Sequence, residues 1–309
     1  MSWARTLLLK AAENRWLRER APQYSFVKRG VARFMPGESV ADAFRAVREL
    51  QAKGIGAVLT ALGENVADRN EAEAETSHYA DVLGQIWVQR IPAEISVKLT
   101  HLGLDLDKEF CFANLSRLIA ISPTGKTVWI DMEQSSNVNA TLEIYRRARE
   151  AGANVGVCLQ SYLRRTEEDI RKLLPLGGAI RLVKGAYNET PEVAFPHKRD
   201  VDENYFRIAQ TLLGEDARRA GLRAAIATHD IRLIARIQEW AAANGLAKNQ
   251  LEFQMLYGIQ RAEQLRLATE GCRSVVLVAY GKYWFPWYMR RLAERPANVW
   301  FLARNFFSG

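Results

Sequence analysis

Eight apolar runs rich in β-branched residues alternate with helical patterns along this chain, and that alternation restricts its fold most. The runs cover residues 55–62, 95–100, 128–133, 155–160, 179–184, 224–229, 251–257 and 274–280. Amphipathic helical periodicity fills most of the intervals, as in residues 138–151, 167–174, 202–220, 231–244 and 262–269. Eight strands alternating with helices within 309 residues predict an α/β fold, a parallel (β/α)8 TIM-like barrel, rather than an open doubly wound sheet.

Residues 1–36 precede the alternation and are predicted to form an N-terminal helical segment, so that the barrel occupies residues 37–309. The segment is basic and amphipathic, which favours a packing or lid helix and leaves peripheral membrane contact as an alternative. Ser39, followed three residues later by Asp42, is typical of a capping box and predicts that the next helix begins there.

Composition excludes several classes of protein. With 48% hydrophobic and 25% charged residues, the chain has enough apolar material for a large core. The net charge of +8 comes from dispersed lysines and arginines, so no nucleic-acid partner is expected. Cys111, Cys158 and Cys272 lack CxxC spacing, which favours buried thiols in a reducing compartment. No apolar run approaches the roughly 18 residues of a membrane span, and a cytoplasmic protein is expected.

Polar side chains that a barrel core does not require stand at the carboxyl end of nearly every predicted strand. In chain order they are Lys98, Thr100, His101, Asp131, Glu133, Gln134, Gln160, Arg181, Lys184, Thr228, His229, Asp230, Gln254 and Tyr257. Singly, each has a structural interpretation: Asp230 as a helix N-cap, His229 as a core histidine, and Glu133 with Lys98 as an ion pair. Together, at one end of a barrel, they predict a functional site.

The last predicted strand leads through aromatic residues into a helix that carries Arg290 and Arg291, with Glu294 one turn later. On an ordinary helix, Glu294 would bridge both arginines on a solvated face. Paired guanidinium groups above an aromatic floor also suit a carboxylate that must be bound and shielded from water.

The residues alone leave several chemistries open. Lys98 or Lys184 could form a Schiff base in a lyase barrel, and the cationic and amide side chains could instead bind an organic cofactor. A non-catalytic binding barrel is a third reading. The four histidines lack metal-ligand spacing, and Gly54-Ile-Gly56 precedes a strand, unlike a dinucleotide fingerprint.

Several longer sequence motifs resemble the flavin-dependent proline dehydrogenases. The resemblance extends from about residue 93 to residue 302. It is carried by Ser96-Val-Lys-Leu-Thr-His-Leu-Gly103, Ile130-Asp-Met-Glu133, Arg181-Leu-Val-Lys-Gly-Ala-Tyr187, Pro191-Glu-Val-Ala194, Ala227-Thr-His-Asp230, Glu252-Phe-Gln-Met-Leu-Tyr-Gly258 and Arg290-Arg-Leu-Ala-Glu-Arg-Pro296.

The resemblance implies a distorted barrel of the PutA type that binds FAD non-covalently and oxidises proline to 1-pyrroline-5-carboxylate by hydride transfer to flavin N5. Asp131 and Arg181 would be catalytic. The substrate would contact Lys98, Arg290, Arg291, Leu277, Trp287 and Glu294. The cofactor would contact Met132, Gln160, Arg181, Lys184, Gly185, Ala186, Thr228, His229 and Gln254. A membrane quinone is the expected electron acceptor.

The chain departs from the family pattern at the substrate pocket. The last strand reads Leu277-Val-Ala-Tyr-Gly281 where the family usually has Tyr-Val-Pro-Tyr-Gly, and Trp287 stands where another tyrosine is usual. Hydroxyproline or another modified cyclic amino acid is therefore an alternative substrate.

Overall fold

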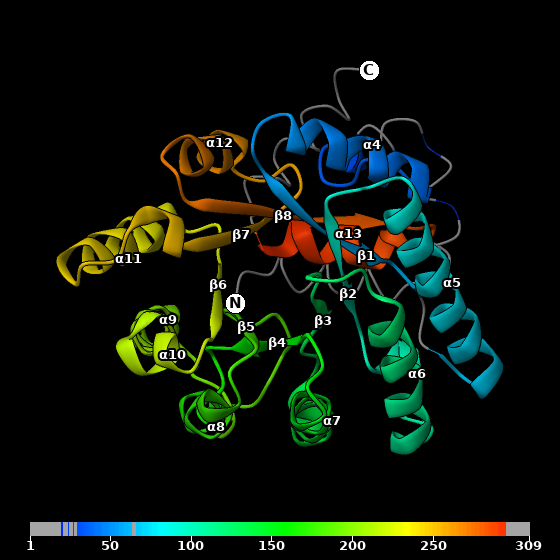
Figure 1. The fold of residues 1–309 in the computed structure, drawn as a ribbon, viewed down its shortest axis with the longest axis horizontal. Helices are drawn as coiled ribbons and strands as arrows, with labels where there is room; N and C mark the ends of the chain where they lie inside the picture. Colours follow the sequence, from blue (N-terminus) through cyan, green and yellow to red (C-terminus); the bar gives the residue numbers. More distant parts are fainter. Residues whose placement is uncertain (1–19, 21–23, 25–26, 28–29, 64–65, 295–309) are drawn as a thin grey trace.

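The computed structural model describes residues 20, 24, 27, 30–63 and 66–294, with the side chains of 290, 293 and 294 left undescribed. Eight parallel strands close a barrel in chain order, and β8 pairs with β1, as the sequence predicted (Figure 1). The strands are β1 (Gly56–Ala61), β2 (Ala93–Val97), β3 (Val128–Ile130), β4 (Val155–Gln160), β5 (Ala179–Val183), β6 (Arg223–Ala227), β7 (Glu252–Leu256) and β8 (Arg273–Tyr280).

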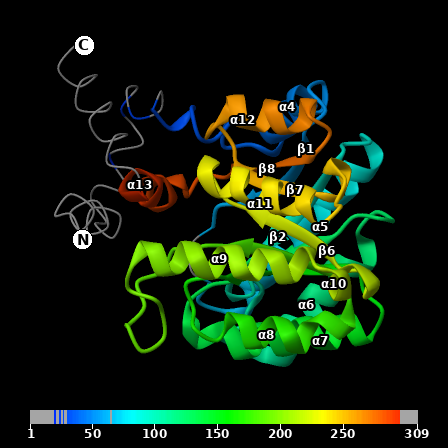
Figure 2. The same ribbon diagram turned by 90° about the vertical axis from the view of Figure 1, so that its left-hand side faces the viewer.

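The helices of the described residues lie outside the strands, except that α13 crosses one end of the barrel (Figure 2). Because α13 directly follows β8, this end is the one at which the strands terminate. The helices are α4 (Val40–Gln51), α5 (Arg69–Val88), α6 (Lys108–Ile121), α7 (Val138–Glu150), α8 (Thr166–Leu173), α9 (Lys198–Leu213), α10 (Glu215–Arg219), α11 (Ile231–Ala243), α12 (Arg261–Thr269) and α13 (Trp284–Glu294).

One of the predicted helices needs correction, and two helices of the structure were not predicted. The single helix expected over residues 202–220 is two helices, α9 and α10, because the backbone of Gly214 is extended between them. Helices α5 and α6 lack a distinct apolar stripe in the sequence; the buried face of α5 includes Thr76 as well as Tyr79. The capping box predicted at the start of α4 is confirmed, since Ser39 and Asp42 bond each other's backbone.

The amino-terminal end of the barrel interior holds a buried ionic cluster. Arg223 pairs with Glu94 at 2.6 Å and with Glu252 at 2.9 Å, so each buried charge has a partner of opposite sign. Trp129 lies beside this cluster, and its indole nitrogen donates to Glu94 at 2.8 Å. Gly156, on the neighbouring strand, leaves room for the indole; a Cβ there would lie 2.5 Å from it. A packed floor therefore closes this end.

The predicted N-terminal segment lies largely outside the described residues. Its described part packs against α13: Val31, Phe34 and Met35 form an apolar cluster with Trp284 and Tyr288. The boundary predicted near residue 36 therefore stays a prediction.

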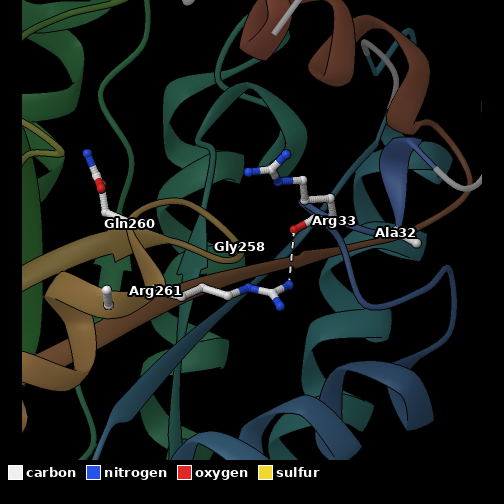
Figure 3. Close-up of a pocket in the computed structure, with 6 residues that line it drawn as sticks. Ala32, Arg33, Gly258, Gln260 and Arg261 are labelled. Carbon is white, nitrogen blue, oxygen red and sulfur yellow. Dashed lines mark hydrogen bonds between the residues drawn. The ribbon is translucent and has the colours of Figure 1, made fainter. Parts of the chain in front are cut away.

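A hollow of about 680 Å³ lies between residues 32–33 and the loop that follows β7 (Figure 3). Arg33 and Arg261 give it a cationic lining, and the Arg261 guanidinium donates to the carbonyl oxygen of Arg33 at 3.4 Å. None of the predicted site residues lines this hollow. The predicted chemistry therefore belongs elsewhere on the barrel.

The expectations drawn from composition can be compared with the described residues. All three cysteines are free and buried, as predicted. Across residues 30–63 and 66–294, no helix has both the length and the apolar character needed to cross a bilayer.

Candidate functional site

Arg181 is the centre of the candidate site, and it is held by side chains from β2 and from the end of β3. It lies on β5 with only 4% of its side chain exposed, and its Nη1 donates to Asp131 at 3.0 Å and to Ser96 at 3.1 Å. Ser96 in turn donates to the same Asp131 oxygen at 2.7 Å. The guanidinium carbon lies 4.5 Å from the Trp129 ring centroid, in the range of a cation–π contact. These contacts fix the guanidinium in one orientation.

Three buried polar atoms of Arg181 and Gln160 have no hydrogen-bond partner within the described structure. Arg181 Nε and Nη2 and Gln160 Oε1 are buried without a hydrogen bond, although Gln160 Nε2 donates to the carbonyl oxygen of Glu133 at 3.2 Å. Leaving such a group unpaired costs roughly 1–3 kcal/mol. A planar heterocycle with ring nitrogens and carbonyl oxygens at its edge supplies both acceptors and donors. The donor set therefore fits a flavin.

Lys184, at the end of β5, lies between two carboxylates. Its Nζ donates to Asp202 at 2.5 Å and to Asp230 at 2.9 Å, and Lys198 contacts the same two residues. Burial acts to raise the pKa of Asp230, but the hydrogen bond and charge of Lys184 outweigh it and hold that pKa at about 2. Asp230 also caps α11, as the sequence suggested, by accepting from Leu233 N at 3.4 Å.

The loops after β5 and β6 place backbone and small side chains at the same end. Gly185 has a φ of +119°, and a Cβ there would lie 2.2 Å from the Tyr162 ring, so only glycine fits. His229 Nε2 accepts from Leu256 N at 2.9 Å, so the neutral ring carries its proton on Nδ1. Thr228 is buried and accepts from Asp230 N, whereas Ala186 is exposed.

Lys98 and Glu133 stand beside this group at the ends of β2 and β3. Glu133 accepts from Thr100 N at 3.2 Å and from Thr100 Oγ1 at 2.7 Å. Burial raises the pKa of Glu133, and the charge of Lys98 is among the factors that lower it. The carboxylate predicted as a partner for Lys98 therefore has strong hydrogen bonds of its own.

The predicted substrate residues come from β8 and α13. Leu277 is half-buried and packs on the apolar layer formed around Trp129. On α13, the guanidinium carbon of Arg291 lies 6.0 Å from the ring centroid of Trp287. The sequence predicted paired guanidinium groups above an aromatic floor, and the contact of Arg291 with Trp287 is the described part of that arrangement; its substrate role stays a prediction. The side chains of Arg290 and Glu294 lie outside the described part.

Two predicted cofactor residues belong to the packed interior. Met132 is buried in the main apolar core. Gln254 is also buried, and its amide nitrogen donates to Glu252 at 2.7 Å, within the ionic cluster at the other end of the barrel. The described contacts of Gln254 thus support the barrel floor, and its cofactor contact stays a prediction.

Sequence reasoning did not single out several residues that build this site. Ser96 and Trp129 hold Arg181, and Asp202 is a counter-ion of Lys184. The sequence could have indicated Ser96 and Trp129. Ser96 stands two positions before Lys98, and Trp129 two positions before Asp131, so the period of a strand puts them on the same face.

The known proteins that this chain resembles are proline dehydrogenases. The family model described as "Proline dehydrogenase" matches residues 43–304. The chain is 37% identical to "Proline dehydrogenase 1" of Bacillus subtilis (strain 168) over 302 residues, covering 97% of this chain and 98% of that protein. It is 38% identical to "Proline dehydrogenase" of Deinococcus radiodurans over 287 residues, covering 90% of each.

A solved structure supports the same assignment. It is proline utilization A (PutA) from Bdellovibrio bacteriovorus inactivated by N-propargylglycine, which aligns with a TM-score of 0.79 at 25% sequence identity. The alignment covers 86% of this chain but 32% of that longer chain. The barrel and these matches agree, and the chain belongs to the proline dehydrogenase family.

Proposed function

We propose that this protein is an FAD-dependent proline dehydrogenase that converts L-proline into 1-pyrroline-5-carboxylate. The observation that carries the proposal is Arg181, whose guanidinium is held by Asp131 and Ser96 while Nε and Nη2 stay buried and unpaired. Family membership supplies the reaction class.

One set of site residues would bind the cofactor and another set the substrate. When bound, the flavin supplies the acceptor for the hydride that leaves the carbon next to the ring nitrogen. Arg181 would donate toward the flavin edge that gains electron density on reduction, and Gln160 would contribute an amide to the same ring. Gly185, Ala186, Lys184, Thr228 and His229 would hold the remainder of the cofactor.

The substrate would be bound through its carboxylate. Lys98 approaches from the barrel rim and Arg291 from α13, and the sequence adds Arg290 beside it. The aromatic residues of α13, which are packed with residues 31–35, would cover this end of the barrel and exclude water, which would strengthen contacts between charges. Asp131 would keep Arg181 in position and balance its charge.

A modified ring is the second candidate substrate, and Leu277 favours it. Leucine is smaller than the tyrosine usual in the family and has no hydroxyl, so the pocket should be roomier as well as less polar at this wall. 4-Hydroxyproline or a larger ring derivative would then be accepted. A Schiff-base lyase that uses Lys184 is less well supported, because two carboxylates engage that amine; Lys98 is the other nucleophile that a lyase could use.

The cellular setting follows from the family resemblance and the charge of the chain. We propose a cytoplasmic enzyme that visits the inner face of the membrane peripherally, passes electrons to a quinone and has no nucleic-acid partner. The test of the reaction is product analysis after incubation of the FAD-loaded protein with proline, hydroxyproline and N-alkyl prolines. A product that has two hydrogens fewer than the substrate supports the proposal. Recovery of every compound unchanged contradicts it.

A further inference from the structure

Arg181 keeps two donors unpaired although a carboxylate of the barrel floor lies close by. Its Nε and Nη2 are buried without a hydrogen bond within the described residues. Glu94, which belongs to the ionic floor, stands on β2 two positions before Ser96, and Ser96 already bonds Arg181 at 3.1 Å. Side chains two positions apart on a strand lie on the same face. The carboxylate and the guanidinium therefore face the same part of the barrel interior, and an obstacle must keep them apart.

The indole of Trp129 is that obstacle. Its ring centroid lies 4.5 Å from the guanidinium carbon of Arg181, and its Nε1 donates to Glu94 Oε2 at 2.8 Å. Trp129 is fully buried, and Gly156, which pairs with it on β4, has no side chain where the indole packs. The ring thus contacts the guanidinium while the edge contacts the carboxylate. The indole fills the space through which the two groups would otherwise approach each other.

Glu94 is an anion that would attract an unpaired guanidinium. Burial acts to raise its pKa, but the hydrogen bonds and charge of Arg223, together with the bond from Trp129, hold that pKa below its ordinary value. Its Oε1 accepts from Arg223 at 2.6 Å and from Thr127 N at 3.3 Å, and its Oε2 accepts from Arg223 at 3.1 Å. Removing the indole would therefore vacate one acceptor position, on Oε2.

We propose that Trp129 is a positioning residue that separates Arg181 from the floor carboxylate and so keeps the Nε and Nη2 donors directed toward the cofactor. This inference rests on the proposed function, since it assigns those donors to the flavin. Asp131 and Ser96 both bond Nη1, so they fix one corner of the guanidinium and do not by themselves fix its plane. The indole restricts the remaining rotation. Without it, Arg181 would donate to Glu94 and lose that donor for the flavin.

Two substitutions of Trp129 distinguish this separation from a purely structural role. Trp129→Phe removes the indole nitrogen and its bond to Glu94, but keeps an aromatic ring next to Arg181. Trp129→Leu removes both the nitrogen and the ring. Both variants should lose thermal stability, because each leaves a cavity and breaks the bond to Glu94. Only Trp129→Leu should also lose the orientation of Arg181.

Titration of the cofactor-free protein with FAD, followed by quenching of the flavin fluorescence, measures that difference. Trp129→Leu should bind FAD roughly 10- to 100-fold more weakly than the wild type, or about 1.4–2.8 kcal/mol, since a charge-assisted hydrogen bond is lost. Trp129→Phe should bind FAD nearly as tightly as the wild type. Trp240→Leu, in α11 outside the barrel, is the matched control and should leave the affinity unchanged. Affinities that fall in step with the unfolding midpoints of the two Trp129 variants would overturn the inference.

A crystal structure of cofactor-free Trp129→Leu tests the separation without any flavin. Nε or Nη2 of Arg181 should lie within hydrogen-bond distance of Glu94, and an Arg181 that keeps its wild-type position refutes the proposal. Failure of the proposed function looks different, because the wild type itself would then not bind FAD, whereas Arg181 would still move toward Glu94 in the variant.

Nuclear magnetic resonance of the wild type provides the test if Trp129→Leu does not fold. The Nε–H proton of Arg181, assigned by its loss in Arg181→Lys, should be shifted upfield by the indole ring in the cofactor-free protein. It should move downfield when FAD binds and accepts from it. A proton that lacks either shift contradicts the inference.

Discussion

Replacing Asp131 with asparagine tests whether the carboxylate is what holds Arg181. The two side chains are 3.0 Å apart, with 4% of Arg181 and 21% of Asp131 exposed. At that distance and an effective dielectric constant of about 20, the gross attraction is roughly 5–6 kcal/mol. The amide oxygen can still accept from Ser96 and Arg181, and an aspartate that is partly exposed is partly hydrated. We therefore expect a net loss of about 2–3 kcal/mol.

Two measurements follow from that figure. The thermal unfolding midpoint should fall by roughly 3–5 °C, at about 1.5 °C per kcal/mol for a chain of this size. The reduction potential of the bound flavin should rise by about 40–65 mV, because removing a negative charge favours the electron-rich reduced form, and 30 mV corresponds to about 1.4 kcal/mol for two electrons.

The matched control is Asp169→Asn on helix α8. Asp169 is 7% exposed and pairs with Arg165 at 2.7 Å, outside the barrel interior. It should lose a comparable amount of stability and leave the flavin potential unchanged. If Asp131→Asn matches the wild type in both midpoint and potential, the account of Arg181 is wrong.

Three further predictions concern the substrate helix, the pocket wall and the barrel floor. Arg291→Ala should retain flavin and lose about 2–4 kcal/mol of transition-state binding, roughly 30- to 1000-fold in kcat/KM, because the guanidinium binds the substrate carboxylate. Unchanged steady-state kinetics would show that Arg291 lies on a solvated helix face and has no role in substrate binding. Leu277→Tyr should shift the ratio of kcat/KM values toward proline over 4-hydroxyproline by about 1–3 kcal/mol, and an unaltered ratio would refute the role of this wall. Arg223→Met leaves Glu94 and Glu252 buried without their shared cation, so urea unfolding should show a loss of about 3–5 kcal/mol; an unchanged midpoint would contradict it.

The barrel was predictable because its signal is local. Each strand is a short apolar run, and the polar residues that end the runs lie at one end of any parallel barrel. Ser39 and Asp42 likewise interact over three residues, and their capping box is present. Local chemistry was less informative for α5, whose buried face includes Thr76 and Tyr79 among the aliphatic residues.

The partners within the site could not be read from sequence, since they join distant positions. Arg181 bonds Asp131, 50 residues away, and Ser96, 85 residues away. Which side chains meet depends on the register of four neighbouring strands and on the volume of Trp129 between them. The two counter-ions of Lys184 come from α9 and from the end of β6, and neither position alone indicates the pairing.

Anaerobic reduction of the bound flavin by the substrate tests the central claim most directly. Purified protein loaded with FAD should be yellow. Addition of proline or a close analogue under anaerobic conditions should bleach its visible absorbance at least as fast as the enzyme turns over. Arg291→Ala should keep the colour and bleach far more slowly, which separates cofactor binding from substrate binding. A protein that cannot be loaded with FAD, or one whose flavin no cyclic amino acid reduces, would contradict the account.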